Sequence, residues 1–346
     1  MLANTFNLLN MPESFLFRAD ASTSIGTGHV MRCLALAQAA QDEGHSTTFL
    51  MNGLTDRVKE NNCEVVELKS ERGSFSDAKE TSDLAKKLNA KCIVDGYAFA
   101  DEYQYALKQS GARFMLIDDY GQATSYSADM ILNQNSYAES LRDIYEKRSS
   151  GSELLLGSKY TMLRREFRDI DPNPSVPIKA KSILVTLGGG DPDNVTLRVV
   201  KLLSQIEDIE ATIVVGGMNL HLNDIKVSAK DMNVLTDVHD MPSLISEAEL
   251  AITAGGSTTY EMAYMGVPTV AITIANNQQP VVADLGERGV VESIGRPDEW
   301  SDDDLLTIVR GLINNQSKRK EMSDNGRMLI DGKGAERVLE KLLKFV

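Results

Sequence analysis

The stretch FLFRADASTSIGTGHVMRCLALA, residues 15–37, indicates which fold this chain adopts. Its apolar start predicts a buried strand at residues 15–17, and residues 30–43 predict a helix. The turn Gly26-Thr27-Gly28 lies between them, and glycine lets the backbone take positive φ and approach a ligand closely. A helix N-terminus also offers unpaired N–H groups and a positive dipole end, which suit phosphate. Because His29 sits at that end, the stretch predicts a titratable group beside an anion site.

Taken alone, this first signal is weak. A Gly-x-Gly turn after a strand also occurs in α/β proteins that bind nothing there. His29 could equally be a polar residue at a helix start. A functional interpretation therefore needs support from the rest of the chain.

Composition narrows the class of protein. A length of 346 residues is more than one hydrophobic core usually serves, so two domains are expected. The apolar share of 42% and the charged share of 25% are typical of soluble globular proteins. The net charge of −14 argues against nucleic acid or an anionic membrane as partner, although backbone amides can still hold a nucleotide. No apolar run is long enough to predict a membrane span.

Three cysteines, Cys33, Cys63 and Cys92, are far apart and lack a metal-ligand spacing. This pattern favours reduced thiols that act as small buried apolar residues in a cytoplasmic protein. The first residues carry no basic segment and no cleavage site of a signal peptide. Residues 1–12 are interpreted as a disordered extension, with Met11 as the working start of the protein as the alternative.

Strands and helices alternate along both halves, which predicts parallel sheets. In the first half, strands are expected at 15–17, 47–51, 64–68, 91–94, 113–117 and 130–132, and helices at 30–43, 77–88 and 102–110. In the second half, strands are expected at 182–187, 211–215, 233–235, 250–253, 269–272 and 289–291, and helices at 194–206, 258–265, 302–314, 316–324 and 334–345.

The fold class is therefore α/β, with two Rossmann-like domains that face a cleft. The first domain is predicted at 13–168 and the second at 181–346. A linker at 169–180 separates them, because its three prolines prevent a helix or a central strand. Ligands of such sheets bind outside the carboxyl ends of the strands, so the glycine turns at 26–28, 188–190 and 255–256 are expected at one cleft.

The second strong motif is AGGSTTYEMAYMGVP at residues 254–268. A strand ends in two glycines, and the backbone amides of Gly256, Ser257 and Thr258 are predicted to bind a diphosphate at the start of a helix. Glu261 lies one turn inside and could accept two hydrogen bonds from a ribose diol. The alternative is that Thr258 and Glu261 form a capping box.

Polar residues at other strand ends are weaker candidates. The amide side chains of Asn277 and Gln278 could recognise sugar hydroxyl or acetamido groups, or simply belong to a polar loop. Asp118 and Asp119 could be an acid or metal site, but Asp-Asp-Tyr-Gly is also ordinary turn chemistry. Without a nearby histidine or third carboxylate, no metal is expected.

Further candidates lie on the sugar side. Asn133 and Asn135 follow a strand and could face the sugar. Residues 159–167 are predicted to be helical and could place Tyr160 and Arg164 on one face, or form a solvated charged helix. The other histidines, His45, His221 and His239, lie outside the glycine turns and are interpreted as surface or loop residues.

Together these segments resemble the UDP-sugar hydrolases of pseudaminic acid biosynthesis (PseG type), which are related in fold to the glycosyltransferase MurG. The segments that carry the resemblance are 17–21, 25–33, 95–97, 117–119, 187–191 and 255–268, and the likeness extends over about residues 14–340. It implies a GT-B fold and hydrolysis of UDP-2,4-diacetamido-2,4,6-trideoxy-β-L-altropyranose to UDP and the free sugar, without a metal or other cofactor.

The resemblance also implies roles for residues. The catalytic histidine falls on His29, the UDP-binding elements on Gly190, Asp191, 255–258 and Glu261, and the sugar-side tyrosine on Tyr97. The full predicted substrate-binding set is Gly26, Thr27, Gly28, Arg32, Asp20, Tyr97, Asp118, Asn133, Gly189, Gly190, Asp191, Gly255, Gly256, Ser257, Thr258, Glu261, Asn277 and Gln278.

The physical properties of a histidine at a helix start agree with this role. A positive helix end disfavours the imidazolium, so a neutral His29 could deprotonate a water molecule aimed at the anomeric carbon. Helix-end amides could stabilise the charge that grows on the departing UDP. The expected partner is therefore a small UDP-sugar, and the chain is expected to be a cytoplasmic monomer that binds neither nucleic acid nor membrane.

Three other functions stay open. A glycosyltransferase of the same fold would use His29 to activate an acceptor hydroxyl, although the sequence shows no basic or apolar patch typical of membrane-acceptor transferases. A non-catalytic protein would bind the UDP-sugar without turnover. A nicotinamide dehydrogenase is disfavoured because the turn lacks the third glycine of G-x-G-x-x-G and the acidic residue about 20 positions on.

Overall fold

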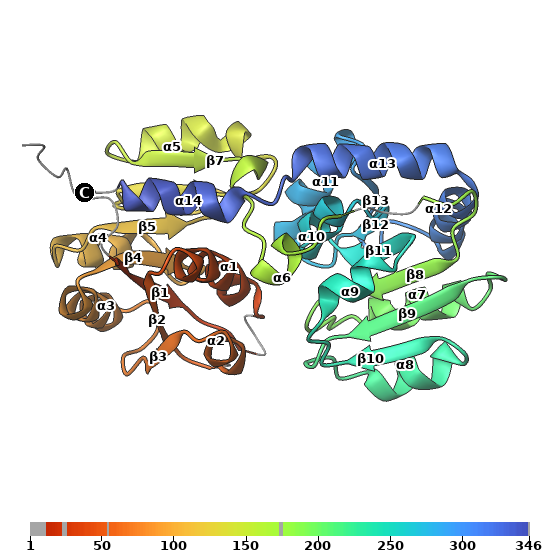
Figure 1. Ribbon diagram of the computed structural model, residues 1–346, viewed down its shortest axis with the longest axis horizontal. Helices are drawn as coiled ribbons and strands as arrows, with labels where there is room; N and C mark the ends of the chain where they lie inside the picture. Colours follow the sequence, from red (N-terminus) through yellow and green to blue (C-terminus); the bar gives the residue numbers. More distant parts are fainter. Residues whose placement is uncertain (1–11, 23–25, 54, 173–175, 345–346) are drawn as a thin grey trace, which may run out of the picture.

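The computed structural model describes residues 12–22, 26–53, 55–172 and 176–344. The predicted extension at 1–12 lies almost wholly outside these residues, and so do linker residues 173–175. The chain forms two parallel sheets, each with helices packed on both faces, and the two halves lie side by side (Figure 1). The α/β fold predicted from the sequence is confirmed.

The first sheet has seven parallel strands in the order β3-β2-β1-β4-β5-β6-β7. Their bounds are Ser14–Ala19 for β1, Ser46–Met51 for β2, Glu64–Glu67 for β3, Ala90–Asp95 for β4, Phe114–Ile117 for β5, Met130–Asn133 for β6 and Glu153–Leu156 for β7. The strand order reverses between β1 and β4, and ligands of open parallel sheets bind at such a switch point. The six strands predicted for this half are confirmed, whereas β7 was not predicted.

Helices cover both faces of this sheet. They are α1 (Gly28–Asp42), α2 (Asp56–Glu60), α3 (Phe75–Leu88), α4 (Asp101–Gln109), α5 (Arg142–Arg148) and the 3₁₀ turns η1 (Ala138–Leu141) and η2 (Ser158–Tyr160). The short helix α6 (Arg165–Arg168) lies between the halves, and its Phe167 packs in a core of the second half. The helix predicted at 159–167 is wrong. The hydroxyl of Thr161 donates to the carbonyl of Gln134 and the Met162 amide donates to the Gln134 side chain, and these bonds hold the segment between η2 and α6 extended.

The second sheet has six parallel strands in the order β10-β9-β8-β11-β12-β13. They are β8 (Ser182–Thr186), β9 (Glu210–Val215), β10 (Asn233–Thr236), β11 (Leu250–Ala254), β12 (Thr269–Ile272) and β13 (Val291–Gly295). The strand predicted at 289–291 begins later, because residues up to Val290 close the preceding helix through a hydrogen bond from the Val290 amide to the Leu285 carbonyl.

The helices of the second half include several that the sequence did not predict. The predicted ones are α7 (Val195–Leu203), α10 (Thr258–Met265), α12 (Asp302–Asn314), α13 (Gln316–Leu329) and α14 (Gly334–Leu343). The others are α8 (Leu222–Ala229), α9 (Met241–Ser246), α11 (Gln279–Glu287) and the turn η3 (Asn276–Gln278). Here too the strand order reverses, between β8 and β11.

The last helix returns to the first half. Helix α14 lies against the first sheet (Figure 1), where Val338, Leu339 and Leu342 join the core formed by α1 and the strands. Lys91 of β4 donates to the carbonyl of Leu342 at 2.8 Å. The predicted boundaries of the two domains stay predictions, but α14 packs outside the domain, 181–346, to which the sequence assigned it.

Replacing Leu339 with alanine tests this packing. Leu339 is fully buried in the first core, so Leu339→Ala should lower the free energy of unfolding by about 2–5 kcal/mol. The measurement is urea unfolding followed by circular dichroism. Glu336→Ala, on the exposed side of the same helix, is the matched control and should unfold almost as the wild type does. Equal stability of Leu339→Ala and the wild type would contradict the packing of α14.

Candidate active site

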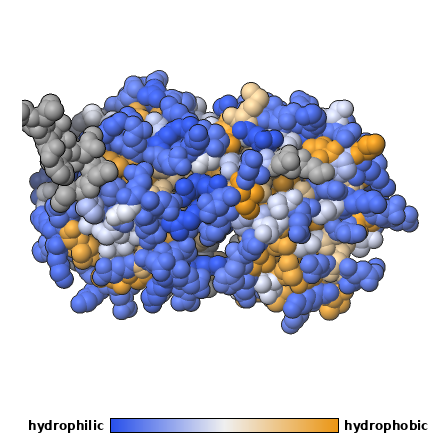
Figure 2. Space-filling view, in the orientation of Figure 1, coloured by the Kyte–Doolittle hydropathy of each residue, from blue (hydrophilic) through white to orange (hydrophobic). Residues whose placement is uncertain are grey.

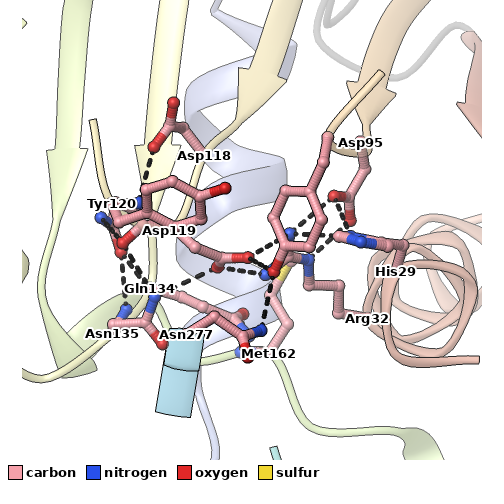
Figure 3. A network of polar contacts seen from close by, with 12 residues as sticks. His29, Arg32, Asp95, Asp118, Asp119, Tyr120, Gln134, Asn135, Met162 and Asn277 are labelled. Carbon is pink, nitrogen blue, oxygen red and sulfur yellow. Dashed lines mark hydrogen bonds and ion pairs between the residues drawn. The ribbon is translucent and has the colours of Figure 1, made fainter. Parts of the chain in front are cut away.

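His29 and Asp95 meet at the switch point of the first sheet. His29 lies in the first turn of α1, which follows β1, and Asp95 is the last residue of the neighbouring strand β4. The Nδ1 atom of His29 lies 2.8 Å from Oδ1 of Asp95 (Figure 3). A carboxylate only accepts, so Nδ1 carries the proton and donates it to Asp95. The basic lone pair is then on Nε2, which has no hydrogen-bond partner among the described residues.

Arg32 holds Asp95 from the other side. It lies one helical turn after His29, and its Nε and Nη2 atoms each donate to a carboxylate oxygen of Asp95 at 2.6 Å. Burial by itself raises the pKa of Asp95, but the charge of Arg32 and the hydrogen bonds from Arg32 and His29 outweigh it and hold this pKa well below its usual range. Asp95 is therefore ionised at neutral pH and fixes the orientation of the imidazole.

The same guanidinium reaches a second carboxylate. Nη1 of Arg32 donates to Asp119 at 2.6 Å, and the hydroxyl of Tyr97 donates to the other oxygen of Asp119 at 3.0 Å. The Tyr97 ring stands edge-on to the His29 ring, with centroids 4.6 Å apart. Burial and the charge of Asp119 raise the pKa of Tyr97, so its hydroxyl keeps its proton. Asn277 of the second half donates to the same hydroxyl at 3.1 Å.

This arrangement changes the role of one predicted residue and adds two. Arg32 was predicted to bind substrate, but its donors are taken up by Asp95 and Asp119, so it positions other groups. Asp95 and Asp119 were not in the predicted substrate-binding set, although Asp119 was considered together with Asp118 as an acid or metal site. Both follow apolar strand runs, and that position was the signal in the sequence that could have selected them.

Asp118 and Asn133 lie on the side away from His29, although the sequence predicted them in the site. Asp118 accepts hydrogen bonds from the amides of Tyr120 and Gly121 and from the hydroxyls of Tyr126 and Tyr145, and Figure 3 shows it turned away from the cluster. Asn133 is fully buried and donates to the carbonyl of Asp119 and the hydroxyl of Tyr145. These two side chains shape the turn that presents Asp119.

A cavity of about 290 Å³ opens beside His29. Asp20, Arg72, Asp95, Tyr97 and other residues of the first half line it. The Asp20 carboxylate is 5% exposed and accepts a hydrogen bond from the Asn52 amide at 2.8 Å. The structure thus brings Asp20, His29 and Tyr97 of the predicted set together around one cavity.

The glycine turn before His29, residues 26–28, lies at the surface of the molecule. Gly26 has φ +81°, which favours glycine, and Thr27 precedes α1 without a side-chain cap. A Cβ added at Gly28 would meet no atom within 4 Å. The first turn of α1 contains no acidic side chain, so its amides keep a positive end free of a competing carboxylate.

The glycine turns of the second half lie at its own switch point. Gly189, Gly190 and Asp191 follow β8, and Gly255, Gly256 and Ser257 follow β11 and precede α10. The two carboxylate oxygens of Asp191 accept hydrogen bonds from the amides of Val195 and Thr196, so Asp191 caps α7. A Cβ at Gly255 would lie 2.1 Å from Val282, whereas a Cβ at Gly256 would meet nothing within 4 Å. Gly255 therefore serves packing, and Gly256 borders open space.

Glu261 and Gln278 make different contacts. The capping-box alternative for Thr258 and Glu261 is wrong, because Ser257 precedes α10 and makes no side-chain cap. Glu261 instead lies 3.5 Å from Arg164 of the first half; burial raises the pKa of Glu261, and Arg164 opposes this effect. Gln278 accepts a hydrogen bond from the Ile274 amide and stabilises its own loop.

Two general features of the molecule bear on the class of site. Within the described residues, no group of three or more His, Cys, Asp and Glu side chains is arranged as a metal site. None of the helices described is both long enough and apolar enough to cross a membrane. The face of the molecule in Figure 2 is mainly hydrophilic, and its apolar side chains form small separate patches.

Comparison with known proteins shows that the second half is similar to a known family. Residues 183–338 match the glycosyltransferase family 28 C-terminal domain. This family 28 match covers β8 to α14 and so includes both glycine turns of the second half.

Two curated relatives align along much of the chain. One is the spore coat polysaccharide biosynthesis protein SpsG of Bacillus subtilis, 24% identical, with 92% of this chain and 95% of the relative covered. Another is the UDP-2,4-diacetamido-2,4,6-trideoxy-β-L-altropyranose hydrolase of Campylobacter jejuni, 25% identical, with 79% and 96% covered. The resemblance drawn from the sequence is thereby confirmed.

Solved structures show the fold. MurG of Acinetobacter baumannii superposes with a TM-score of 0.63 at 18% identity, covering 96% of this chain and all of that one. The UDP-bound structure of MnaA from Staphylococcus aureus gives a TM-score of 0.68 at 12% identity, with 96% of both chains covered. The two-domain fold is therefore the GT-B fold.

The ionic cluster around Arg32 should make the free energy of unfolding depend on pH in the acidic range. Burial raises the pKa of Asp119, but Arg32 outweighs this and lowers it, as it lowers that of Asp95. A depressed pKa stabilises the fold above the unfolded-state value of about 3.9, and this contribution is lost as the pH falls below it. Asp119→Asn should therefore cost about 1–3 kcal/mol at pH 7 and should flatten the fall in stability below about pH 4.

The measurement is urea unfolding of the wild type and the variant between pH 3 and pH 7. Asp303→Asn on the exposed surface of α12 is the control and should keep the wild-type pH dependence. A wild-type pH dependence of stability in Asp119→Asn would argue that the Arg32–Asp119 pair adds nothing to the fold.

Proposed function

We propose that this protein hydrolyses a UDP-sugar, with His29 as the general base. The observation that carries the proposal is the His29–Asp95 pair, whose free Nε2 atom stands beside a cavity of about 290 Å³. The Campylobacter relative, a named UDP-sugar hydrolase aligned over 79% of this chain, supports the choice of reaction. The sugar named for that relative is the proposed substrate, UDP-2,4-diacetamido-2,4,6-trideoxy-β-L-altropyranose.

The proposed reaction is a displacement at the anomeric carbon. Nε2 of His29 takes a proton from a water molecule as the water oxygen attacks that carbon, and the bond to the β-phosphate oxygen breaks. Asp95 keeps the proton on Nδ1 and stabilises the positive charge that His29 gains. The bonding electrons leave with UDP, and the His29 proton is later returned to solvent.

The second half is proposed to hold UDP. The amides at the start of α10 follow the turn at Gly255 and Gly256, and a Cβ added at Gly256 would meet no atom within 4 Å. Amides at such a helix start bind and stabilise the diphosphate. Glu261, half-buried one turn inside, is proposed to accept the ribose hydroxyls. The UDP-bound MnaA structure shows that a protein of the same fold binds UDP, which supports UDP as the nucleotide.

A glycosyltransferase is the second candidate, and the family 28 match favours it. In that reaction His29 would take the proton from an acceptor hydroxyl in place of water. Turnover measured without an acceptor distinguishes the hydrolase from the glycosyltransferase. The purified protein is incubated with a panel of UDP-sugars, and the release of UDP and the anomeric signal of the sugar are followed by NMR. Release of UDP without an acceptor supports the hydrolase, and binding without release supports the transferase.

Replacing the base should remove turnover and leave binding intact. His29→Ala is expected to lower kcat by roughly 10²–10⁴-fold, because a positioned general base contributes about that factor. UDP affinity, measured by calorimetry, should stay at the wild-type value. His221→Ala, just before α8, is the control and should keep full activity. Near-normal turnover in His29→Ala would refute the assigned base.

The proposed diphosphate site can be tested without turnover. A Cβ at Gly256 points into open space, so Gly256→Ala should fold normally but block the approach of a phosphate. We expect UDP to bind at least about tenfold more weakly, a loss of about 1.4 kcal/mol. Gly311→Ala on α12 also adds a Cβ in open space and should leave UDP affinity unchanged. Unaltered UDP affinity in Gly256→Ala would place the diphosphate elsewhere.

A further inference from the structure

Arg72 is a cation at the cavity beside His29 that has no partner among the residues the structure describes. It lies in the loop between β3 and α3, is exposed, and lines the same cavity as His29 and Asp20. It forms no ion pair or hydrogen bond with any of the residues that the structure describes. The guanidinium is therefore free to bind a ligand in that cavity.

The loop that carries Arg72 is fixed in place. Glu80 of α3 accepts hydrogen bonds from the Lys69 amide at 3.0 Å and from the Ser70 hydroxyl at 2.7 Å. The Gly73 amide donates to Asp77 at 2.8 Å. Gly73 has φ +74°, and a Cβ there would lie 2.5 Å from the Ala98 carbonyl oxygen. Only glycine allows this close approach, which presses the loop against residues 96–99 at the cavity wall.

Asp20 supplies the complementary group on the cavity wall. Its Oδ1 atom accepts from the Asn52 amide, and its Oδ2 atom lies 2.8 Å from Nη1 of Arg18. Oδ2 is buried, and its contact with Arg18 lacks hydrogen-bond geometry, so it accepts no hydrogen bond from a described residue. Arg18 also donates twice to Asp77, at 2.9 and 2.8 Å, so one buried arginine fixes both Asp20 and the base of the Arg72 loop.

The cavity thus offers the Arg72 guanidinium, which only donates hydrogen bonds, and the Asp20 carboxylate, which only accepts them. A guanidinium has no acceptor and a carboxylate has no donor. An acylamino substituent presents the matching pair, a carbonyl oxygen and an N–H. A cavity of about 290 Å³ is at the lower end of the range for small-molecule sites, so it suits one sugar rather than a whole nucleotide-sugar.

We propose that Arg72 and Asp20 determine the sugar specificity of this site. Arg72 donates to the carbonyl oxygen of an acylamino substituent, and the Asp20 carboxylate, which lines the same cavity, accepts from its N–H. This inference rests on the proposed function, since it assumes a sugar in the cavity beside His29. It assigns neither residue a part in the proton transfer.

The test measures binding, so it does not need turnover. Calorimetry compares UDP with UDP-2,4-diacetamido-2,4,6-trideoxy-β-L-altropyranose on the non-hydrolysing His29→Ala variant and on His29→Ala with Arg72→Ala. The preference for the nucleotide-sugar over UDP should fall about 10- to 100-fold when Arg72 is removed, because a hydrogen bond to a charged group is lost. Arg72→Lys should restore part of it, and Arg327→Ala, an exposed arginine of α13, should change nothing.

The outcomes separate this proposal from the proposed function. An unchanged preference in the Arg72→Ala variant overturns the assignment. Equal losses of affinity for UDP and for the nucleotide-sugar also overturn it, because Arg72 would then contact the diphosphate. In the His29-intact enzyme, Arg72→Ala should raise KM and leave kcat within about threefold. Failure of hydrolysis in the wild type would count against the proposed reaction, while the binding comparison would still report on Arg72.

Discussion

The Arg32 guanidinium lies between Asp95 and Asp119 and joins three elements of the first half. Arg32 belongs to α1, Asp95 ends β4 and Asp119 follows β5. The planar guanidinium of arginine makes bidentate hydrogen bonds with carboxylates, and these fix the orientation of the carboxylate as well as its distance. Removing one member of such a cluster costs far more than the pair contributes net, since it leaves a buried charge unpaired. The positions of His29 and Tyr97 follow from this one side chain.

A second buried arginine supports the same edge of the sheet. Arg18, at the end of β1, is fully buried and binds Asp77 and Asp20. Burial by itself lowers the pKa of the Arg18 guanidinium. The carboxylates around it outweigh this effect, so the pKa of Arg18 lies above its usual value. Apolar residues fill the middle of the sheet, whereas its carboxyl end is held by two ionic clusters. Such clusters add little net stability, so their value here is the fixed geometry that a site requires.

The sequence predicted the periodic parts of the molecule and missed what depends on contacts between distant residues. Strand and helix patterns located most elements, and the glycine turns located both switch points. Asp118 and Asp119 show the limit. The two are adjacent at a strand end, and the hydrogen bonds that Asp118 accepts from its own turn and from Tyr126 and Tyr145 decide that Asp119 is the one that binds Arg32. Arg72 gave no local signal, because its place at the cavity depends on the close approach of Gly73 to Ala98. The amphipathic pattern of α14 likewise predicts a helix but not the sheet that it covers.

The contacts between the two halves differ in how easily they break. Tyr260 is 2% exposed and its hydroxyl accepts a hydrogen bond from the Ser136 amide at 3.1 Å, so this contact is buried and costly to open. The hydrogen bond from Asn277 to Tyr97 lies in the open, where such a bond contributes only about 0.5–1.5 kcal/mol. The contact at Tyr260 therefore holds the two halves together more firmly than the contact at Asn277 does. Tyr97 also binds Asp119 and packs against His29, so the hydrogen bond from Asn277 joins the second half to the polar chain that ends at the base.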